Sequence, residues 1–398
     1  MRPGCLVVEF FDDANWLGGS VYIENLLTLL ALLPAGERPR VRLQLLGEPT
    51  TPMARRLLAH PLLSGTGARG NSAAATFARR VHRAVLRRAP WLGALFAAPG
   101  DEVVFPAFDA TQRWRRNLFW IPDFQHRHLP EFFDAAEIAW RERCYADIAR
   151  SRGLLLLSSE AAHADFRAFY PRATVQPRVW SFCSAVPVGP AGECEAVLRR
   201  HGLPERFLYV ANQFWRHKDH ATLFEALRLL RDRGLVVPLV CTGRTGDRRD
   251  PAYFPELGRA LDRDGLRGQV SLLGVLPREE QVAIFRSAAA VVQPSRFEGW
   301  SVVVEDAKAL GRPVIASDIA VHREQLDGVP GAVLFRVSDA AHLAECIAVS
   351  WPLLAKGPDT ECERRAAEAA SLERREAAKR FAAIVDEALA LPSTGPPA

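Results

Sequence analysis

Lysine and methionine are scarce in this sequence of 398 residues, which has four lysines (218, 308, 356 and 379) and two methionines. Arginine supplies nearly all of the positive charge, a composition that excludes no function by itself. Long apolar runs are also missing: LLTLLALL at 26–33 is much shorter than the ~20 residues of a membrane-spanning helix. The N-terminus MRPGCLVVEF lacks the pattern of a secretory signal. We therefore expect a globular protein of the cytoplasm.

Cysteine pairs at metal-ligand or redox spacing are absent. The seven cysteines are scattered and odd in number, which predicts reduced and mostly buried thiols. The sequence also shows no acidic cluster suited to a metal ion. We therefore expect neither a metal nor a cofactor. With 48% hydrophobic residues, the chain is long enough for two domains, each with its own core.

Acidic residues are missing between 49 and 100, where eight arginines fall, five of them in RRVHRAVLRR (79–88). This stretch continues into the apolar WLGALF, so two interpretations of 79–96 stay open. The segment contacts an anionic membrane surface or an anionic acceptor, or it is a solvated basic helix beside a buried one. A role in binding nucleic acid is disfavoured, because no aromatic-interleaved or zinc motif accompanies the basic residues.

Short leucine-rich or β-branched runs alternate with longer helical patterns along the chain, which predicts parallel βα units. The expected fold class is α/β, with two doubly wound, Rossmann-like sheets that carry helices on both faces. Ligands of such folds bind in a cleft at the carboxyl ends of the strands. The expected strands are 5–10, 41–46, 102–105, 117–122 and 153–159 in the first half, and 206–212, 236–243, 269–274, 289–295 and 313–318 in the second.

The proline- and glycine-rich stretch 187–204 has no strong period and predicts a linker. We accordingly place one domain at 1–190, the linker at 191–204 and a second domain at 205–371. One apolar stripe then predicts a helix over 372–391 that packs back on the first domain, followed by a disordered tail at 392–398. The stripe consists of Phe381, Ile384, Val385, Ala388 and Leu389.

Three carboxylates lie in PSRFEGWSVVVEDAKALG (294–311), namely Glu298, Glu305 and Asp306. The pattern predicts a strand, a loop at its carboxyl end, and a helix capped by Ser301 whose positive N-terminus suits a phosphate group. At about 100° per residue, Asp306 falls at the border of the buried face and Glu305 nearly opposite. We therefore expect Glu305 to face solvent and Asp306 to be the partner of Glu298. The alternative is that Asp306 only favours the positive end of the helix.

The longer stretch PSRFEGWSVVVEDAKALGRPVIASDIAVHREQ resembles the signature of the family 4 glycosyltransferases, retaining enzymes of the GT-B fold that use nucleotide-sugar donors. The family pattern is a Glu, seven residues and a second Glu, then a short helix, Gly-x-Pro-Val, and a Ser followed seven positions later by Glu. The resemblance also extends through 155–166, 209–227 and 271–288, and so covers most of the chain. The matching residues are Glu298, Asp306, Gly311, Pro313, Val314, Ser317 and Glu324.

The resemblance implies roles for residues of this stretch. Glu298 would lie near the donor sugar and its anomeric carbon, while Asp306, one methylene shorter than the family's Glu, would accept the ribose hydroxyls. The loop amides of Gly299, Trp300 and Ser301 would meet the donor phosphates. The first domain would then bind the acceptor and the second the nucleotide-sugar.

The family's basic pair around the diphosphate, an Arg and a Lys five residues later, is only half matched. Lys218 corresponds to the Lys, but Asn212 and Gln213 stand where the Arg is expected, and Arg216 is the candidate replacement. Fixed cations would neutralise the departing diphosphate. The alternative is that Arg216 and Lys218 are surface residues opening a helix over 219–231, although a helix start is a poor place for cations.

Gly18 and Gly19 follow the first expected strand, as does the family's glycine loop, and would let the backbone approach a phosphate or sugar closely. A tight strand-to-helix turn would need glycines as well. In WIPDFQHRHLPEFF, Pro122 replaces the His that relatives often have, and Asp123 keeps the following Asp. We expect His126 to be a sugar or acceptor ligand, with Asp123 as the other candidate; a buried structural role for His126 is the alternative.

These features predict a retaining, metal-independent glycosyltransferase that moves a hexose from a UDP- or GDP-sugar to a glycan or lipid-linked acceptor, in bacterial surface polysaccharide assembly. Retention through a covalent intermediate needs a carboxylate against the anomeric carbon. The family is generally thought to use same-face attack instead. Two alternatives are a non-hydrolysing sugar-nucleotide epimerase of the same fold and a non-catalytic module that binds nucleotide-sugars.

Overall fold

The computed structural model describes residues 4–12, 17–46, 48–69, 101–110 and 115–391. The chain forms two compact units: the first comprises Met1–Phe124, Ala135–Cys183 and Leu372–Ala398, and the second Gln125–Asp134 and Ser184–Ser371. The division differs from the expected one because 125–134 groups with the second unit and the boundary falls after 183. The basic segment 79–96 and the tail 392–398 lie outside the described residues.

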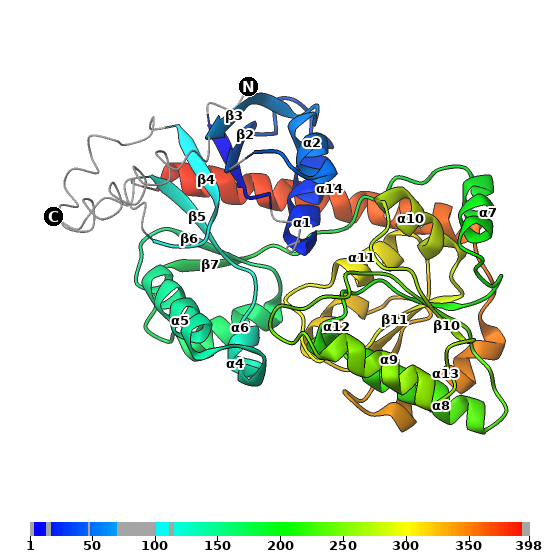
Figure 1. The fold of residues 1–398 in the computed structure, drawn as a ribbon. Helices are drawn as coiled ribbons and strands as arrows, with labels where there is room; N and C mark the ends of the chain where they lie inside the picture. The colour runs from blue at the N-terminus through cyan, green and yellow to red at the C-terminus, as the bar shows by residue number, and fades with distance from the viewer. Residues whose placement is uncertain (1–3, 13–16, 47, 70–100, 111–114, 392–398) are drawn as a thin grey trace. The chain divides into compact units, whose positions relative to one another are not determined.

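The first unit is built on a seven-stranded parallel sheet in the order β3-β2-β1-β4-β5-β6-β7 (Figure 1). Buried leucine, valine and phenylalanine side chains fill the central strands, which is typical of a parallel sheet covered on both faces. The strands are β1 (Cys5–Phe10), β2 (Arg40–Leu46), β3 (Leu63–Arg69), β4 (Glu102–Ala107), β5 (Arg116–Ile121), β6 (Leu154–Leu157) and β7 (Gln176–Val179). The described helices are α1 (Leu17–Ala31), α2 (Pro52–Leu58), α5 (Ala135–Ala149) and α6 (Glu160–Phe169).

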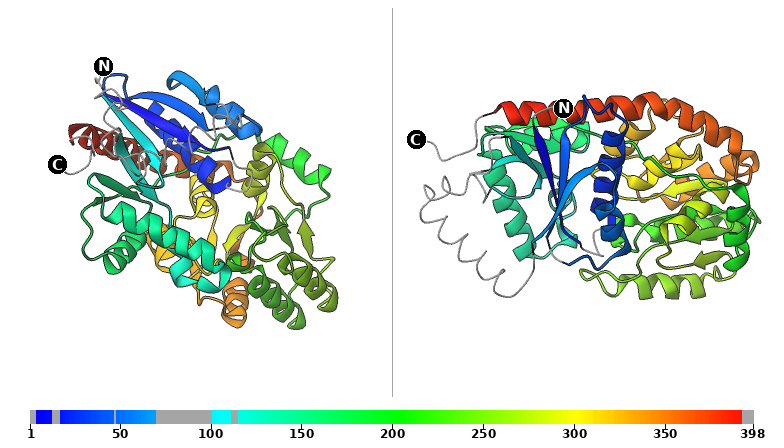
Figure 2. Two further views of the ribbon diagram at one scale, coloured as in Figure 1. Left: turned by 60° about the vertical axis from the view of Figure 1, so that its left-hand side comes forward. Right: turned by 90° about the horizontal axis from the view of Figure 1, so that it is seen from above.

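The last helix, α14 (Thr360–Ala390), is a single continuous helix whose residues from Leu372 onward belong to the first unit (Figures 1 and 2). The Phe381 ring is fully buried between the rings of Phe105 and Trp180, at centroid distances of 5.4 and 4.9 Å. The Trp180 indole N–H also donates to the carbonyl of Ala377 at 2.8 Å. The apolar stripe of this helix is therefore part of the core of the first unit.

The second unit contains a six-stranded parallel sheet in the order β10-β9-β8-β11-β12-β13. Its strands are β8 (Leu208–Val210), β9 (Leu239–Cys241), β10 (Val270–Leu272), β11 (Ala290–Gln293), β12 (Val314–Ser317) and β13 (Val333–Phe335). Its helices are α4 (Gln125–His128), α7 (Ala191–Arg200), α8 (His220–Asp232), α9 (Tyr253–Arg263), α10 (Arg278–Ser287), α11 (Val302–Ala309), α12 (Ala320–Leu326) and α13 (Ala340–Ser350), with short 3-10 turns η2 (Pro130–Phe132), η3 (Arg216–Lys218) and η4 (Trp351–Leu353).

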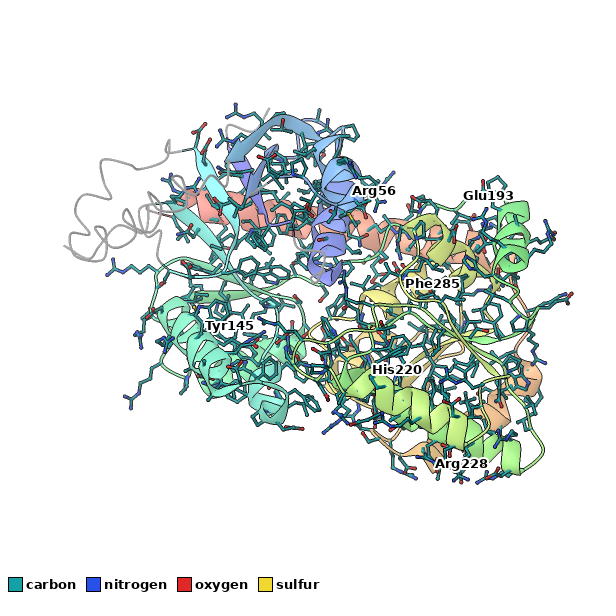
Figure 3. All side chains as sticks on the ribbon, viewed as in Figure 1. Arg56, Tyr145, Glu193, His220, Arg228 and Phe285 are labelled. Atoms are coloured by element: carbon teal, nitrogen blue, oxygen red, sulfur yellow. The ribbon has the colours of Figure 1, made fainter. Side chains whose placement is uncertain are left out.

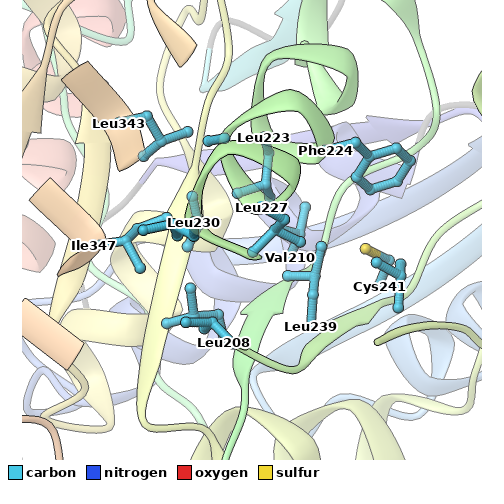
Figure 4. Close-up of a cluster of buried hydrophobic side chains, with 14 of the residues drawn as sticks. Leu208, Val210, Leu223, Phe224, Leu227, Leu230, Leu239, Cys241, Leu343 and Ile347 are labelled. Carbon is cyan, nitrogen blue, oxygen red and sulfur yellow. The ribbon is translucent and has the colours of Figure 1, made fainter. Parts of the chain in front are cut away.

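Alternate residues of the second sheet enter two different cores, as the two-residue period of a strand requires. Leu208 and Val210 of β8 face α8, α9 and α13, whereas Tyr209 faces α7, α10 and α11. Figure 4 shows the first of these cores, in which the leucines of α8 lie over β8 and β9 and meet Leu343 and Ile347 of α13. The doubly wound arrangement expected from the sequence is confirmed.

The expected linker at 191–204 is wrong in its first part, because Ala191–Arg200 form the helix α7. Its buried residues Cys194 and Val197 lie three positions apart and pack with the α10 side of the second sheet. One short apolar stripe among charged residues was too weak to predict this helix. None of the described helices is both long and apolar enough to cross a membrane.

Candidate functional site

The order of the second sheet reverses between β8 and β11: the chain winds outward from β8 through β9 to β10, then returns to β11 on the other side. Ligands of doubly wound sheets bind outside the carboxyl ends of the strands at such a point. Here the buried Asn212, just after β8, donates from its side-chain Nδ2 to Oε1 of Gln293 at the end of β11, at 2.8 Å. A hydrogen bond between two side chains therefore joins β8 and β11 where the strand order reverses, a place that we call the switch point.

Lys218 and Glu298 form an ion pair at the same point. Lys218 Nζ lies 2.5 Å from Glu298 Oε1, and the two side chains are 15% and 10% exposed. Gln293 Nε2 donates to the same carboxylate oxygen at 2.8 Å. Burial is the largest single effect and would raise the pKa of Glu298, but the charge of Lys218, together with further charge and hydrogen bonds to the carboxylate, outweighs it, and the pKa lies below its ordinary value. The carboxylate is therefore ionised at neutral pH and held by two donors.

A second layer of hydrogen bonds supports the loop that carries Glu298. The Ser317 hydroxyl, at the end of β12, donates to the carbonyl of Ser295 at 2.5 Å. His322 Nδ1 lies 2.8 Å from the carbonyl of Ser317. Since a carbonyl only accepts, Nδ1 carries the proton, and burial lowers the pKa of this imidazole so that the ring is neutral. Carboxyl ends of neighbouring strands thus fix the loop at the switch point.

The N-terminus of α11 is capped as expected, with Ser301 Oγ accepting from the Val304 amide at 3.4 Å. Gln325 of α12 pairs with the backbone of Ser301 on both sides: its Oε1 accepts from the Ser301 amide at 3.1 Å and its Nε2 donates to the Ser301 carbonyl at 3.0 Å. The Ser301 amide, which we expected to meet donor phosphates, is therefore bonded to Gln325. Gly299 and Trp300 lie in the loop before it, and their predicted phosphate contacts stay predictions.

The prediction that Glu305 faces solvent is wrong. Glu305 is 2% exposed and accepts from Gln325 Nε2 and from Lys308 Nζ, each at 3.0 Å. The helical-wheel argument assumed that only one face of α11 is covered, but α12 also packs against this helix and its Gln325 reaches Glu305. Glu305 therefore belongs to a buried polar network that joins α11 to α12.

Asp306 is not the partner of Glu298 in this structure. It is 2% exposed and its Oδ2 lies 2.7 Å from the guanidinium of Arg278, the first residue of α10. Sequence reasoning missed Arg278, because the residue lies 28 positions upstream and on another element. The position of Asp306 on the border of the buried face allowed several partners.

Arg216 is held away from the ion pair at the switch point. Its guanidinium bonds to Asp250 at 2.5 Å and Glu256 at 2.8 Å, and it lies over the Tyr253 ring at 4.6 Å. The hydrogen bond to Asp250 is the main cause of its raised pKa. Two carboxylates thus compensate this charge, which leaves Lys218 as the predicted cation that contacts Glu298.

His126 and Asp123 belong to different units. His126 is 1% exposed in α4, with its ring edge-on to Phe133 at 6.3 Å, and belongs to the second unit. Asp123 belongs to the first unit, where its carboxylate lies 3.8 Å from Arg141. The burial of His126 agrees with the structural alternative stated above, and its role as a sugar or acceptor ligand stays a prediction.

The segment 125–134 packs on loops that follow β9 and β11. Arg296, two residues before Glu298, lies 3.3 Å from the Glu131 carboxylate and 5.1 Å from the Phe132 ring. The ring of Phe297 lies 5.1 Å from that of His128. The first half of the chain therefore contributes a segment to the surroundings of the Glu298 loop.

Gly18 and Gly19 both lie in the first turn of α1, in the first unit. A side chain at Gly18 would meet no other atom of the described protein within 4 Å. At Gly243, by contrast, φ is +141° and a Cβ would come 2.1 Å from the carbonyl of Asn212. Gly243 is therefore the glycine that close packing at the switch point requires, and it escaped sequence reasoning. In the described part of the chain, no group of three or more His, Cys, Asp or Glu side chains is arranged to hold a metal ion.

We expect Gln325→Leu to lower the free energy of unfolding by about 1–3 kcal/mol, because it leaves the buried Glu305 and the Ser301 backbone short of hydrogen bonds. The change keeps a side chain of similar size. Urea unfolding followed by circular dichroism measures the loss. Gln176→Leu, at an exposed position of the edge strand β7, is the matched control, with an expected change below about 0.5 kcal/mol. Equal effects in the two variants would contradict the network.

The family model described as "Glycosyl transferases group 1" matches residues 204–350. Among curated proteins, the chain is 26% identical over 221 residues to the O-antigen chain mannosyltransferase B of Escherichia coli, which is 54% of this chain and 56% of that protein. It is 33% identical over 156 residues to a D-inositol 3-phosphate glycosyltransferase of Thermobifida fusca (strain YX), 36% of this chain and 35% of that protein. The chain thus spans about half or less of the length of these relatives.

Solved structures resemble the chain over almost its whole length. The Anabaena protein Alr3699/HepE in complex with UDP-glucose superposes with a TM-score of 0.65 at 17% identity, covering 97% of this chain and 98% of that one. WaaG, a glycosyltransferase involved in lipopolysaccharide biosynthesis, gives a TM-score of 0.57 at 14% identity, covering 97% and 98%. At these identities the likeness establishes the fold, which is that of the GT-B glycosyltransferases.

Proposed function

We propose that this chain, which carries a group 1 glycosyltransferase domain at residues 204–350, transfers a hexose with retention from a UDP- or GDP-sugar to a glycan or lipid-linked acceptor. The observation that carries the proposal is the Lys218–Glu298 pair at the switch point of the second sheet, 2.5 Å apart and mostly buried. A cation at this place can neutralise the departing diphosphate, and a carboxylate beside it can stabilise the positive charge that develops on the sugar.

The chemistry assigns a different task to each group. Lys218 binds the diphosphate and offsets the negative charge that grows as the bond to the sugar breaks. Glu298, which is ionised because its pKa is lowered, supports positive charge at the anomeric carbon and positions the sugar. In same-face attack the leaving phosphate accepts the acceptor's proton. Neither task needs a metal ion, and we propose that the transfer is metal-independent.

The relatives support a setting in cell-surface polysaccharide synthesis. One relative is named as an O-antigen chain mannosyltransferase, and the similar fold of Alr3699/HepE has been solved with UDP and with UDP-glucose. We propose that the donor binds to the second unit and that the first unit binds the acceptor. Residues Asn212, Gly299 and Trp300 complete the donor site in this proposal, with His126 as a sugar or acceptor ligand.

A donor screen tests the proposal. The purified chain is incubated with UDP-, GDP-, ADP- and dTDP-sugars, with and without EDTA, and free nucleoside diphosphate is measured together with thermal stabilisation by each donor. We expect one preferred donor, slow hydrolysis without acceptor and no effect of EDTA. Conversion of the donor to its epimer would support the epimerase instead. Stabilisation without any hydrolysis or transfer would indicate a module that binds nucleotide-sugars without catalysis.

A further inference from the structure

Arg278 occupies an unusual place for a cation, the first position of the helix α10. The positive end of a helix disfavours a positive side chain, so this residue needs compensation. Two fixed partners supply it: a guanidinium nitrogen lies 2.7 Å from Asp306 Oδ2, and Nη1 donates to Gln281 Oε1 at 2.8 Å. Because both terminal nitrogens of the guanidinium are bonded, the Arg278 side chain has little rotational freedom.

Asp306 itself is arranged asymmetrically. Its side chain is 2% exposed, and Oδ2 is engaged by Arg278, while Oδ1 has no hydrogen-bond partner among the residues that the structure describes. A buried carboxylate oxygen without a donor costs free energy, so a native protein rarely leaves one unsatisfied. The free oxygen therefore calls for a donor that is absent from the protein, such as a hydroxyl group of a ligand.

The pair lies beside the carboxyl ends of β8 and β9. Tyr209 lies within β8 and Thr242 directly follows β9, and the Tyr209 hydroxyl and Thr242 Oγ1 are 2.6 Å apart. Burial raises the pKa of Tyr209, and the charges of Arg278 and Asp306 act on it in opposite directions because both groups are close. Asp306 itself lies on α11, the helix that follows the Glu298 loop.

We propose that Arg278 is the positioning residue that makes the short Asp306 side chain a receptor for the ribose hydroxyls of the donor. Arg278 binds Oδ2 and fixes the carboxylate plane, so that Oδ1 is presented to a hydroxyl donor. An aspartate is one methylene shorter than a glutamate and has less reach, so its orientation matters more. This inference rests on the proposed nucleotide-sugar donor. It adds Arg278 as the residue that orients Asp306 toward the ribose of that donor.

Binding of UDP and GDP, each compared with its 2′,3′-dideoxy counterpart, tests the inference by isothermal titration calorimetry. We expect the wild-type protein to bind the ribose form of its preferred nucleotide about 10- to 100-fold more tightly than the dideoxy form, the range for losing hydrogen bonds to a buried charged group. In Arg278→Gln the ratio should fall below about threefold, through weaker binding of the ribose form alone. Affinity for the dideoxy form serves as the measure of an intact site.

Two further variants sharpen the experiment. Arg267→Gln removes an exposed arginine that pairs with Asp262 at 2.7 Å in the same unit, and it should leave the ratio unchanged. Arg278→Gln combined with Asp306→Glu should recover at least part of the ratio, because the longer acid reaches the ribose without the clamp. An unchanged ratio in Arg278→Gln would overturn this inference alone. If the wild-type protein bound no nucleoside diphosphate, that result would refute both the proposed function and this inference.

Discussion

Glu298→Gln is expected to lower the turnover number of sugar transfer by about 10²–10³-fold, the usual effect of removing one preorganised electrostatic contact in a closed site. The replacement keeps the shape of the side chain and its hydrogen bond from Gln293, but removes the negative charge beside Lys218. Donor affinity should stay within a few fold, because the carboxylate acts on the charge that develops during the reaction. Steady-state transfer and donor titration measure the two effects separately.

The partner of Glu298 provides the control for this experiment. If Lys218 and Glu298 act as one unit, Lys218→Met should weaken nucleoside diphosphate binding, and the double variant should lose less activity than the product of the two single losses. Asp262→Asn, an exposed acid on α9, should have no effect. Near-normal turnover in Glu298→Gln, with the fold intact by circular dichroism, would refute the assigned role of Glu298.

The two sheets could be predicted because their inner strands are short leucine-rich or β-branched runs, a pattern that is visible in the local sequence. All ten predicted strands are present, among them β1 at 5–10 with identical bounds. The three strands that we missed, β3, β7 and β13, lie at the edges of their sheets. Edge strands bury fewer apolar side chains, and LSGTGAR in β3 has no apolar run at all. The predicted resemblance to the glycosyltransferases is likewise confirmed, since its motifs are local stretches with fixed spacing.

The arrangement around the site depends on contacts between distant segments, and here prediction failed. Glu305 was assigned to solvent from the period of α11 alone, yet Gln325 of α12 lies against it. Arg216 was the candidate to replace the Arg missing at the expected spacing, but Asp250 and Glu256, more than 30 positions later, hold it. Local periodicity gives the direction of a side chain on its helix, whereas its partner depends on tertiary packing.

The role of Gln293 at the site could have been anticipated from the sequence, whereas the Arg278–Asp306 ion pair and the close packing of Gly243 could not. Gln293 is a polar residue at the end of a fully buried strand, which points to a role at the carboxyl edge of the sheet. By contrast, nothing near Arg278 indicates that it reaches Asp306. The same holds for Gly243, since its positive φ and its place against the Asn212 carbonyl, where an added Cβ would come within 2.1 Å, exist only in the folded sheet. The roles of the site residues in catalysis stay predictions until the variants are measured.

Acid is expected to destabilise the second unit strongly between pH 6.5 and pH 4. His217 and His220 flank Lys218, and burial, together with that cation, lowers the pKa of each to about 3. His220 is fully buried, stacks on Phe214 at 4.2 Å, and marks the start of α8 in Figure 3. Neither of its ring nitrogens has a hydrogen-bond partner among the described residues. The folded protein thus keeps both rings neutral where the unfolded chain would protonate them.

The direction of the effect follows from proton binding. Below about pH 6.5 the unfolded chain binds protons at these positions and the folded protein does not, so the free energy of unfolding falls as the pH falls, until the folded pKa is reached. At pH 5 each histidine costs about 2 kcal/mol relative to pH 7.5. Glu298, with its lowered pKa, adds a further loss that begins as the pH falls through the ordinary carboxyl pKa of 4.5 and continues down to its lower pKa in the folded protein.

His220→Phe separates this contribution from other acid effects. The variant keeps an aromatic ring against Phe214 but cannot take up a proton, so it should lose about 2 kcal/mol less stability than the wild type between pH 7.5 and pH 5. Urea unfolding at pH 7.5, 6 and 5, followed by tryptophan fluorescence, measures the difference. The values at pH 7.5, where the imidazoles are neutral in both states, show the cost of the substitution itself. An equal pH dependence in wild type and variant would mean that burial does not hold His220 neutral in the folded protein.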